Sequence, residues 1–260
     1  MKTPALKIAC ALALMAFAAP TPTLAGEGSL KDGGYEQPTW IATYSGTDFA
    51  KDSFYSYSGA VVSLQRDLSR SGFVFQGFAG YGSYEYDAGG VLGRVDGDIT
   101  QLAAMIGYLF VREGAAVGIY VGADYNDVDL TPNDPLSTVN GSEVGLRIGG
   151  DIRLIGPRHY FSLEGYYSTG FDTYWSRARA GVNMGRFIVG PEATAMGNDG
   201  YDAQRLGGFA MFKLDFLGGR NPAELTLNGG YQFVSNDGVG IGSTVGGEGA
   251  YVGLNLGFAF

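Results

Sequence analysis

The sequence predicts an all-β protein, a single antiparallel up-and-down transmembrane β-barrel of about 12 strands that follows a cleaved signal peptide. Three observations lead to this fold class. The chain begins like an export signal, and apolar residues alternate with small or polar ones along most of the remainder. In addition, 44 of the 260 residues are glycine, which in helices would cost about 1 kcal/mol each relative to alanine. An exported chain with a two-residue period is either a soluble β-sandwich or a membrane barrel.

The first 25 residues have the three parts of a secretory signal peptide. Lys2 and Lys7 give a positive start, residues 8–19 are apolar but too short to span a bilayer, and Thr23-Leu24-Ala25 ends the segment with small residues. The expected organisation is a signal peptide at 1–25, a short periplasmic N-terminal segment at 26–37 and an outer-membrane β-barrel at 38–260.

The remaining chain divides into twelve alternating segments, an even number, as single-chain bacterial barrels have. Strands are expected at 38–46, 54–65, 72–86, 97–112, 115–128, 141–155, 158–169, 174–184, 186–197, 204–216, 222–234 and 248–260. The connections between them alternate between short and long. Short periplasmic turns and long outer loops are the barrel arrangement, and the long loops are expected at 46–53, 87–96, 129–140, 170–173, 198–203 and 235–247.

The last strand gives the clearest pattern. Its alternate apolar residues are Val252, Leu254, Leu256, Phe258 and Phe260. A half-buried strand of a soluble sandwich alternates in the same way. A terminal phenylalanine after alternate apolar residues, however, is similar to the signal read by the bacterial outer-membrane assembly machinery, so these five residues are the expected assembly signal.

Charged residues share one face of several strands, and that face is expected to line the lumen. An Arg or Lys facing hydrocarbon at the bilayer midplane costs about 2–4 kcal/mol, so these side chains should point inward. The candidate lumen charge network is Glu143, Arg147, Asp151, Glu164, Arg177, Arg179, Glu192, Arg205 and Glu224. Folding the hairpins about their turns places Glu164 opposite Arg179. The network either packs the lumen with salt bridges or forms a charged constriction in a channel.

Aromatic residues gather near the outer ends of the predicted strands. The candidate outer-rim aromatics are Tyr84, Tyr86, Tyr125, Tyr174, Trp175 and Tyr201. They fit the interfacial girdle that membrane barrels place at the headgroup level. They equally fit stacking against a neutral polysaccharide, and both roles require the same residue types.

Composition argues against several other classes of protein. A formal net charge of −9 does not suit nucleic-acid binding. The lone cysteine, Cys10, lies in the signal peptide, and His159 is the only histidine, so no metal site and no cofactor are expected. No serine forms a recognisable motif with His159 and no third group would orient it, so the chain is not expected to be an enzyme.

Several short strings in the chain resemble the BcsS family of bacterial cellulose biosynthesis proteins. They are GSEVG at 141–145, YWSRAR at 174–179, GPEA at 190–193, GNDGYDAQR at 197–205 and GEGAY at 247–251. The resemblance extends from the strand at 54 to Phe260. It implies an outer-membrane component that accompanies cellulose synthesis or export in a Gram-negative bacterium, and it brings no catalytic residues with it.

The expected function is therefore an outer-membrane barrel that assists export or surface anchoring of cellulose. A porin-like channel for small polar solutes, or a structural adaptor barrel with no pore, are the alternatives, and a lipid-modifying enzyme is the least supported. The expected partners are outer-membrane lipid and lipopolysaccharide, the assembly machinery, and cellulose or a component of the cellulose synthase complex; nucleic acid is not expected.

Overall fold

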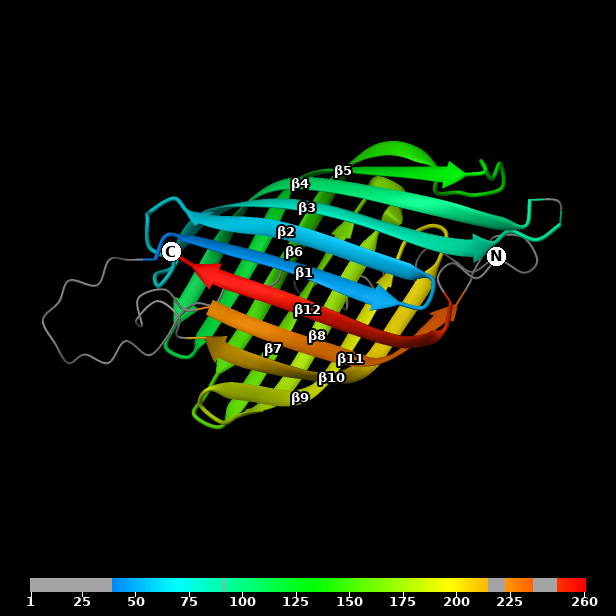
Figure 1. The fold of residues 1–260 in the computed structure, drawn as a ribbon. Coiled ribbons are helices and arrows are strands. Elements are labelled where there is room, and N and C mark those ends of the chain that lie inside the picture. The colour runs from blue at the N-terminus through cyan, green and yellow to red at the C-terminus, as the bar shows by residue number, and fades with distance from the viewer. Residues whose placement is uncertain (1–38, 91, 215–222, 236–246) are drawn as a thin grey trace, which may run out of the picture.

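In the computed structural model, twelve antiparallel strands form one closed barrel (Figure 1). The structure describes residues 39–90, 92–214, 223–235 and 247–260. Each strand pairs with its neighbours in sequence, and β1 closes the ring against β12. The predicted fold class and strand number are therefore confirmed. The predicted signal peptide and periplasmic segment lie outside the described residues.

The strand boundaries lie within a few residues of those predicted. The strands are β1 Ile41–Ala50, β2 Ser53–Ser63, β3 Gly72–Asp87, β4 Arg94–Arg112, β5 Ala115–Thr131, β6 Gly141–Ile155, β7 His159–Ser168, β8 Tyr174–Asn183, β9 Phe187–Gly197, β10 Asp202–Leu214, β11 Ala223–Ser235 and β12 Gly249–Ala259. One 3-10 turn, η1 (Gly170–Asp172), interrupts the connection between β7 and β8. No helix in these parts of the chain is long and apolar enough to cross a membrane.

The two faces of the barrel wall differ as a membrane barrel requires. On β12, Val252, Leu254 and Phe258 are exposed on the outside, whereas Tyr251 and Ala259 are buried inside. On β4, Leu102, Ile106 and Phe110 are also exposed. Large apolar side chains thus cover the outer surface, the arrangement that contact with lipid hydrocarbon favours.

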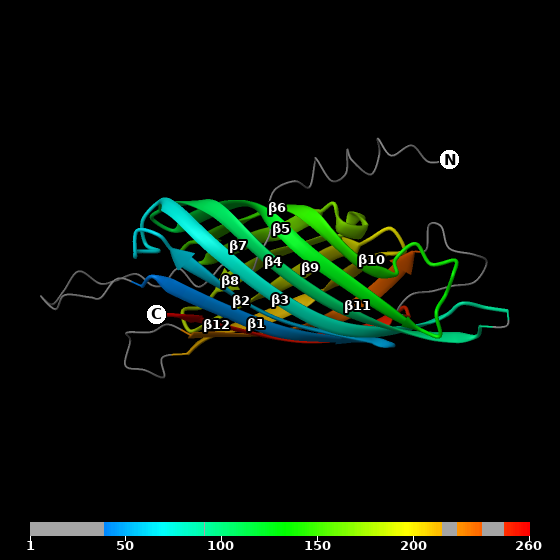
Figure 2. The same cartoon turned by 90° about the horizontal axis from the view of Figure 1, so that it is seen from above.

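The barrel has two different ends. We call the end where β1 begins and β12 stops the terminal rim; it also carries the turns 64–71, 113–114, 156–158 and 184–186. The opposite end, the loop rim, carries the connections 51–52, 88–93, 132–140, 169–173 and 198–201. Strands β3, β4 and β5 are the longest, so the wall that they form projects beyond the others at the loop rim (Figures 1 and 2).

The first loop-rim connection differs from the prediction. A long loop was expected at 46–53, but β1 continues to Ala50, which pairs with Ser53 across a tight turn at Lys51 and Asp52. Asp52 has a φ of 57°, the left-handed conformation that Asp tolerates in turns. The prediction was wrong because the alternation of side chains continues past Gly46, and Asp48 consequently lies inside the barrel.

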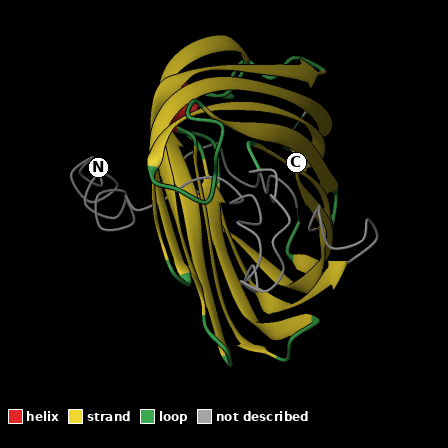
Figure 3. Ribbon diagram, turned by 90° about the vertical axis from the view of Figure 1, so that its left-hand side faces the viewer, coloured by secondary structure: helices red, strands yellow, loops and turns green. Residues whose placement is uncertain are grey.

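The cross-section of the barrel is oval (Figure 3). Toward the terminal rim the interior is filled by an apolar cluster that includes Val61, Val74, Met105 and Tyr120. The turn at 64–71 adds Leu68 to this cluster, and the Leu68 amide donates to the Thr39 carbonyl at 2.8 Å. The terminal-rim half of the barrel is therefore packed like a protein core.

Candidate functional site

Two buried ion pairs lie side by side on the inner face of β7, β8 and β9. Arg177 donates to Glu164 with Nε at 2.6 Å, and Arg179 donates to Glu192 with Nε at 2.5 Å. Asn228 Nδ2 also donates to Glu192 at 3.0 Å. Both oxygens of Glu192 and one oxygen of Glu164 thus accept hydrogen bonds, which lowers the desolvation cost of a buried charge.

The predicted partner of Glu164 was wrong. Glu164 lies opposite Arg177 rather than Arg179, and Arg179 lies opposite Glu192. The β7–β8 pairing is therefore shifted by two residues from the predicted one. The shift arises because β7 ends at Ser168, whose amide donates to the Thr173 carbonyl at 2.8 Å and closes the turn around η1. The turn is centred earlier in the sequence than its composition indicated.

Polar contacts also join strands that are not neighbours in the ring. Arg153 on β6 donates with Nη2 to both oxygens of Glu224 on β11 at 2.8 Å. Arg205 on β10 lies 3.3 Å from Asp48 on β1. The Arg153–Glu224 pair spans the lumen near the terminal rim, and the Arg205–Asp48 pair bridges two intervening strands near the loop rim.

Arg147 and Asp151 occupy the same interior but are less fully paired. The Arg147 guanidinium lies 3.4 Å from the centre of the Tyr166 ring and 4.8 Å from that of Phe78, and its nearest carboxylate, Asp124, is 4.0 Å away. Asp151 is completely buried, and its carboxylate faces the Tyr120 hydroxyl and the Gly118 backbone rather than a cation at salt-bridge distance among the described residues.

Glu143 lies apart from this group. It is exposed near the loop rim, where its carboxylate accepts a hydrogen bond of 2.8 Å from the Phe171 amide. Its position at the rim follows from its place near the start of β6, and it holds η1 rather than joining the lumen pairs.

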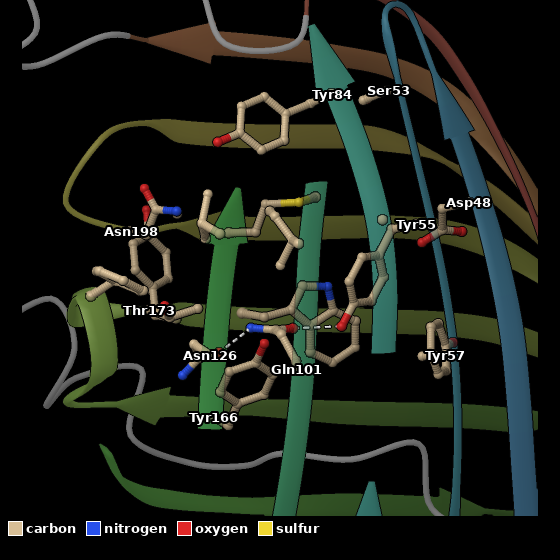
Figure 4. Close-up of a pocket in the computed structure, with 18 of the residues that line it drawn as sticks. Asp48, Ser53, Tyr55, Tyr57, Tyr84, Gln101, Asn126, Tyr166, Thr173 and Asn198 are labelled. Atoms are coloured by element: carbon tan, nitrogen blue, oxygen red, sulfur yellow. Dashed lines mark hydrogen bonds between the residues drawn. The ribbon is translucent and has the colours of Figure 1, made fainter. Parts of the chain in front are cut away.

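A cavity of about 170 Å³ lies between this charged layer and the loop rim (Figure 4). Tyr55, Tyr84, Tyr166 and Trp175 line it together with polar groups from other strands. Those polar groups include Asp48, Gln101, Asn126, Asn198, Arg205 and Gln232. The cavity therefore has aromatic walls and amide, phenol and charged groups among them.

A chain of hydrogen bonds fixes the amide groups of the cavity (Figure 4). The Tyr55 hydroxyl donates to Gln101 Oε1 at 2.5 Å, and Gln101 Nε2 donates to Asn126 Oδ1 at 2.7 Å. Asn126 Nδ2 donates to Asp124 Oδ2 at 3.2 Å, and the Ser168 hydroxyl donates to Asp124 Oδ1 at 2.8 Å. The amides are thus held in fixed orientations before any ligand arrives, which lowers the entropic cost of binding.

The six candidate rim aromatics occupy different surroundings. Tyr125 is exposed on the outside of β5. Tyr84, Trp175 and Tyr201 line the cavity, as does Tyr174, which also donates to Asp202 at 2.6 Å. Burial raises the pKa of Tyr201, in the connection between β9 and β10, to about 12, so its hydroxyl is neutral at physiological pH.

Tyr86, the sixth of these aromatics, lies under the β5–β6 connection. It is buried and donates to Asp134 Oδ2 at 2.8 Å. Val139 from the same connection packs into an apolar cluster with Tyr86 and Phe171. This connection also contacts the β9–β10 connection, because Thr138 Oγ1 donates to the Asp199 carbonyl at 3.2 Å. Two loop-rim connections and η1 thus form one side of the cavity mouth.

Several of these residues were not among the predicted site residues. Asp48 was assigned to a loop, and Asp124, Gln101 and Asn126 were not selected. Their positions in the sequence could have identified them. Polar residues that fall on the inner face of an alternating strand must find hydrogen-bond partners in the lumen. Among the described residues, no cluster of three or more His, Cys, Asp or Glu side chains could hold a metal ion.

The closed ring of strands, the apolar outer surface and the polar interior define a transmembrane β-barrel. Within that class, the chain belongs to the BcsS family of cellulose biosynthesis proteins, whose family model matches residues 42–260. The predicted family is therefore confirmed. No curated protein matches the chain significantly.

Solved structures offer only distant similarity. An outer-membrane channel from Pseudomonas putida F1 is 13% identical, with 89% of this chain and 100% of that one covered and a TM-score of 0.49. A deletion mutant of the monoaromatic hydrocarbon channel TodX is 8% identical, with 85% and 90% covered and a TM-score of 0.43. The β domain of the Bordetella autotransporter BrkA is 12% identical, with 85% and 98% covered and a TM-score of 0.38.

Proposed function

We propose that this chain is an outer-membrane barrel of a Gram-negative bacterium that anchors newly made cellulose at the cell surface without conducting solutes and without catalysis. The family supports the link to cellulose biosynthesis. The belt of exposed apolar side chains supports residence in a lipid bilayer. We place the terminal rim on the periplasmic side of the bilayer and the loop rim on the outer side, because bacterial barrels have short periplasmic turns and longer outer loops.

The observation that carries the proposal is the filled lumen. Arg153–Glu224 joins nearly opposite strands, Arg205–Asp48 bridges non-adjacent strands near the loop rim, and the apolar cluster around Leu68 fills the terminal-rim half. A glucan chain could pass only if these contacts were broken, and breaking one partner from a buried ion pair typically costs about 3–5 kcal/mol. Surface anchoring therefore fits the interior better than export through this barrel or a porin-like role.

The absence of catalysis is supported by the surroundings of the one histidine. His159 is exposed at the start of β7, on the terminal rim and away from the cavity. A binding role requires only the aromatic and amide groups that the cavity already holds in place.

Deleting the gene in its native host tests this function. Surface anchoring predicts that total cellulose is unchanged while the fraction shed into the medium rises, and that the intact gene supplied in trans restores retention. Unchanged retention would contradict the proposal. A fall in total cellulose with an unchanged shed fraction would also contradict anchoring, because it would indicate a role in synthesis or export.

A further inference from the structure

We propose that the loop-rim cavity binds the end of a neutral β-linked glucan chain, one or two sugar units deep. This inference deepens the proposed function, on which it rests for the choice of polysaccharide. The cavity itself is defined independently, by its position, its lining and the residues that close its floor.

The floor of the cavity makes it a closed pocket. Arg147 lies against Tyr166 and Phe78, and Arg205 and Asp48 close another part of the floor. Within the described residues, the lining on the opposite side comes from the loop rim and includes Asn198 and Tyr201. A pocket closed at one end receives the end of a polymer, whereas an open groove would receive its middle.

The aromatic walls suit the C–H faces of pyranose rings. Tyr166 and Trp175 are cross-strand neighbours on β7 and β8, with ring centres 6.3 Å apart and ring planes only 25° from parallel. Arg147 lies over the Tyr166 ring and Arg177 lies 5.0 Å from the centre of the Trp175 ring. The rings are therefore held rigidly while both still line the cavity, and the electron-rich faces of such rings attract C–H groups.

The polar groups of the cavity suit hydroxyl groups rather than ions. The Gln101 and Asn126 amides can each donate and accept hydrogen bonds, as sugar hydroxyls do. The phenols of Tyr84, Tyr166 and Tyr201 line the cavity as well, and a phenol can both donate and accept a hydrogen bond. These phenols can therefore hydrogen-bond to a ligand.

Each arginine at the cavity lies near a carboxylate, which favours a neutral ligand, while Arg147 Nε and Nη1 and Asp48 Oδ1 make no hydrogen bond within the described residues. Arg205 contacts Asp48 and donates with Nε to Gln232 at 2.8 Å. Arg147 is covered by two aromatic rings and faces Asp124. An anionic sugar would have to compete with Asp48 and Asp124, whereas a neutral glucan meets no such repulsion.

Binding can be measured with purified, detergent-solubilised full-length barrel and cellotetraose as the probe. The chain has two tryptophans, and Trp40→Phe leaves Trp175 in the cavity wall as the only tryptophan, which excitation at 295 nm selects over tyrosine. We expect cellotetraose to change the Trp175 emission saturably, and isothermal titration calorimetry of the unmodified protein to give the same Kd. Maltotetraose, with α-linkages, should bind at least tenfold more weakly.

Gln101→Leu provides the test of the site, because it removes the amide while keeping a side chain of similar size. Losing hydrogen bonds to sugar hydroxyls should weaken binding by about tenfold. Leu102→Ala is the matched control, since Leu102 is the next residue on β4 but is exposed on the outside of the barrel. It should leave the Kd unchanged, and circular dichroism shows whether each variant has folded.

Three outcomes would overturn the inference: no cellotetraose binding by folded protein, equal binding of the α-linked tetramer, or a Kd that Gln101→Leu does not alter. Toluene serves as a second probe, because the cavity walls are aromatic. If the protein bound toluene but not cellotetraose, the cavity would be a hydrocarbon site and the inference would be overturned. The gene-deletion experiment tests a separate claim. If cellulose retention depends on the gene but the protein binds no oligosaccharide, only the proposed cavity ligand is refuted. If the protein binds cellotetraose but deletion leaves cellulose retention unchanged, only the anchoring role is refuted.

Discussion

Arg177 connects two walls of the lumen through its guanidinium. It donates to Glu164 with Nε and with Nη2, the latter at 2.5 Å, and to Asn255 on β12 with Nη1 at 3.4 Å. Asn255 also accepts a hydrogen bond from the Tyr57 hydroxyl on β2. A single guanidinium therefore links the wall at β7 and β8 to the wall at β12 and β2.

Replacing Arg177 with methionine should destabilise the barrel strongly. Glu164 would remain buried without its ion-pair partner, and such a loss typically costs about 3–5 kcal/mol. Urea-induced unfolding of the refolded protein in detergent micelles, followed by tryptophan fluorescence, measures this difference in the free energy of unfolding.

The double variant Arg177→Met with Glu164→Leu is the control. Removing both charges leaves no unpaired group, so most of the lost stability should return. If the double variant were as unstable as the single one, the loss would come from packing, and the ion pair would not be the reason that these residues occupy the lumen.

For individual residues, the sequence predicts which charged side chains point into the lumen, but it does not predict which of them form ion pairs. The two-residue period assigns a side chain to one face of a strand, and Arg177, Arg179, Glu164 and Glu192 are all buried inside. Which of them pair depends on the centre of the β7–β8 turn. That centre is set by η1, where Phe171 and Asp172 have positive φ values that composition alone does not reveal.

Among the elements, the turn between β2 and β3 has a structural role beyond connection. Leu68 is 1% exposed and packs with Val61 and Val74 inside the terminal rim. The Asp67 amide donates a hydrogen bond of 3.0 Å to Ser63 Oγ, which bends the turn inward. The turn thus contributes one large side chain to the apolar core that closes this end.

Leu68→Ala should cost about 2–5 kcal/mol, the range for removing a buried leucine side chain. Leu64→Ala is the matched control in the same turn, because Leu64 is 59% exposed, and a surface change of this kind usually stays within about 0.5 kcal/mol. Equal effects of the two substitutions on urea unfolding would contradict the packing of Leu68 in the terminal rim.

The elements also show where prediction by composition failed. Polar residues around Gly46 looked like a loop, yet Tyr44, Gly46 and Asp48 continue the inward face of β1. Gly253 on β12 faces Asp48, and a side chain at that position would collide with the Asp48 carboxylate. The pattern of alternation was therefore more informative than the density of loop-forming residues.

For the whole molecule, the number of strands was predictable and the state of the lumen was not. Twelve alternating segments indicate twelve strands, but they do not determine whether the ring is round or oval. The contacts that fill the interior join residues far apart in sequence, such as Arg153 with Glu224 and Arg205 with Asp48. No periodicity in the chain encodes those pairs, so the choice between a packed lumen and a channel required the structure.

The central claim is that this barrel is filled and binds at its surface rather than conducting through its centre. Planar lipid bilayer recordings with the purified full-length protein test it most directly. We predict no discrete conductance events for the wild type, and none for Arg179→Ala, because the Arg153–Glu224 and Arg205–Asp48 contacts and the core around Leu68 remain. Stable, reproducible channel openings from the folded wild-type protein would contradict the account.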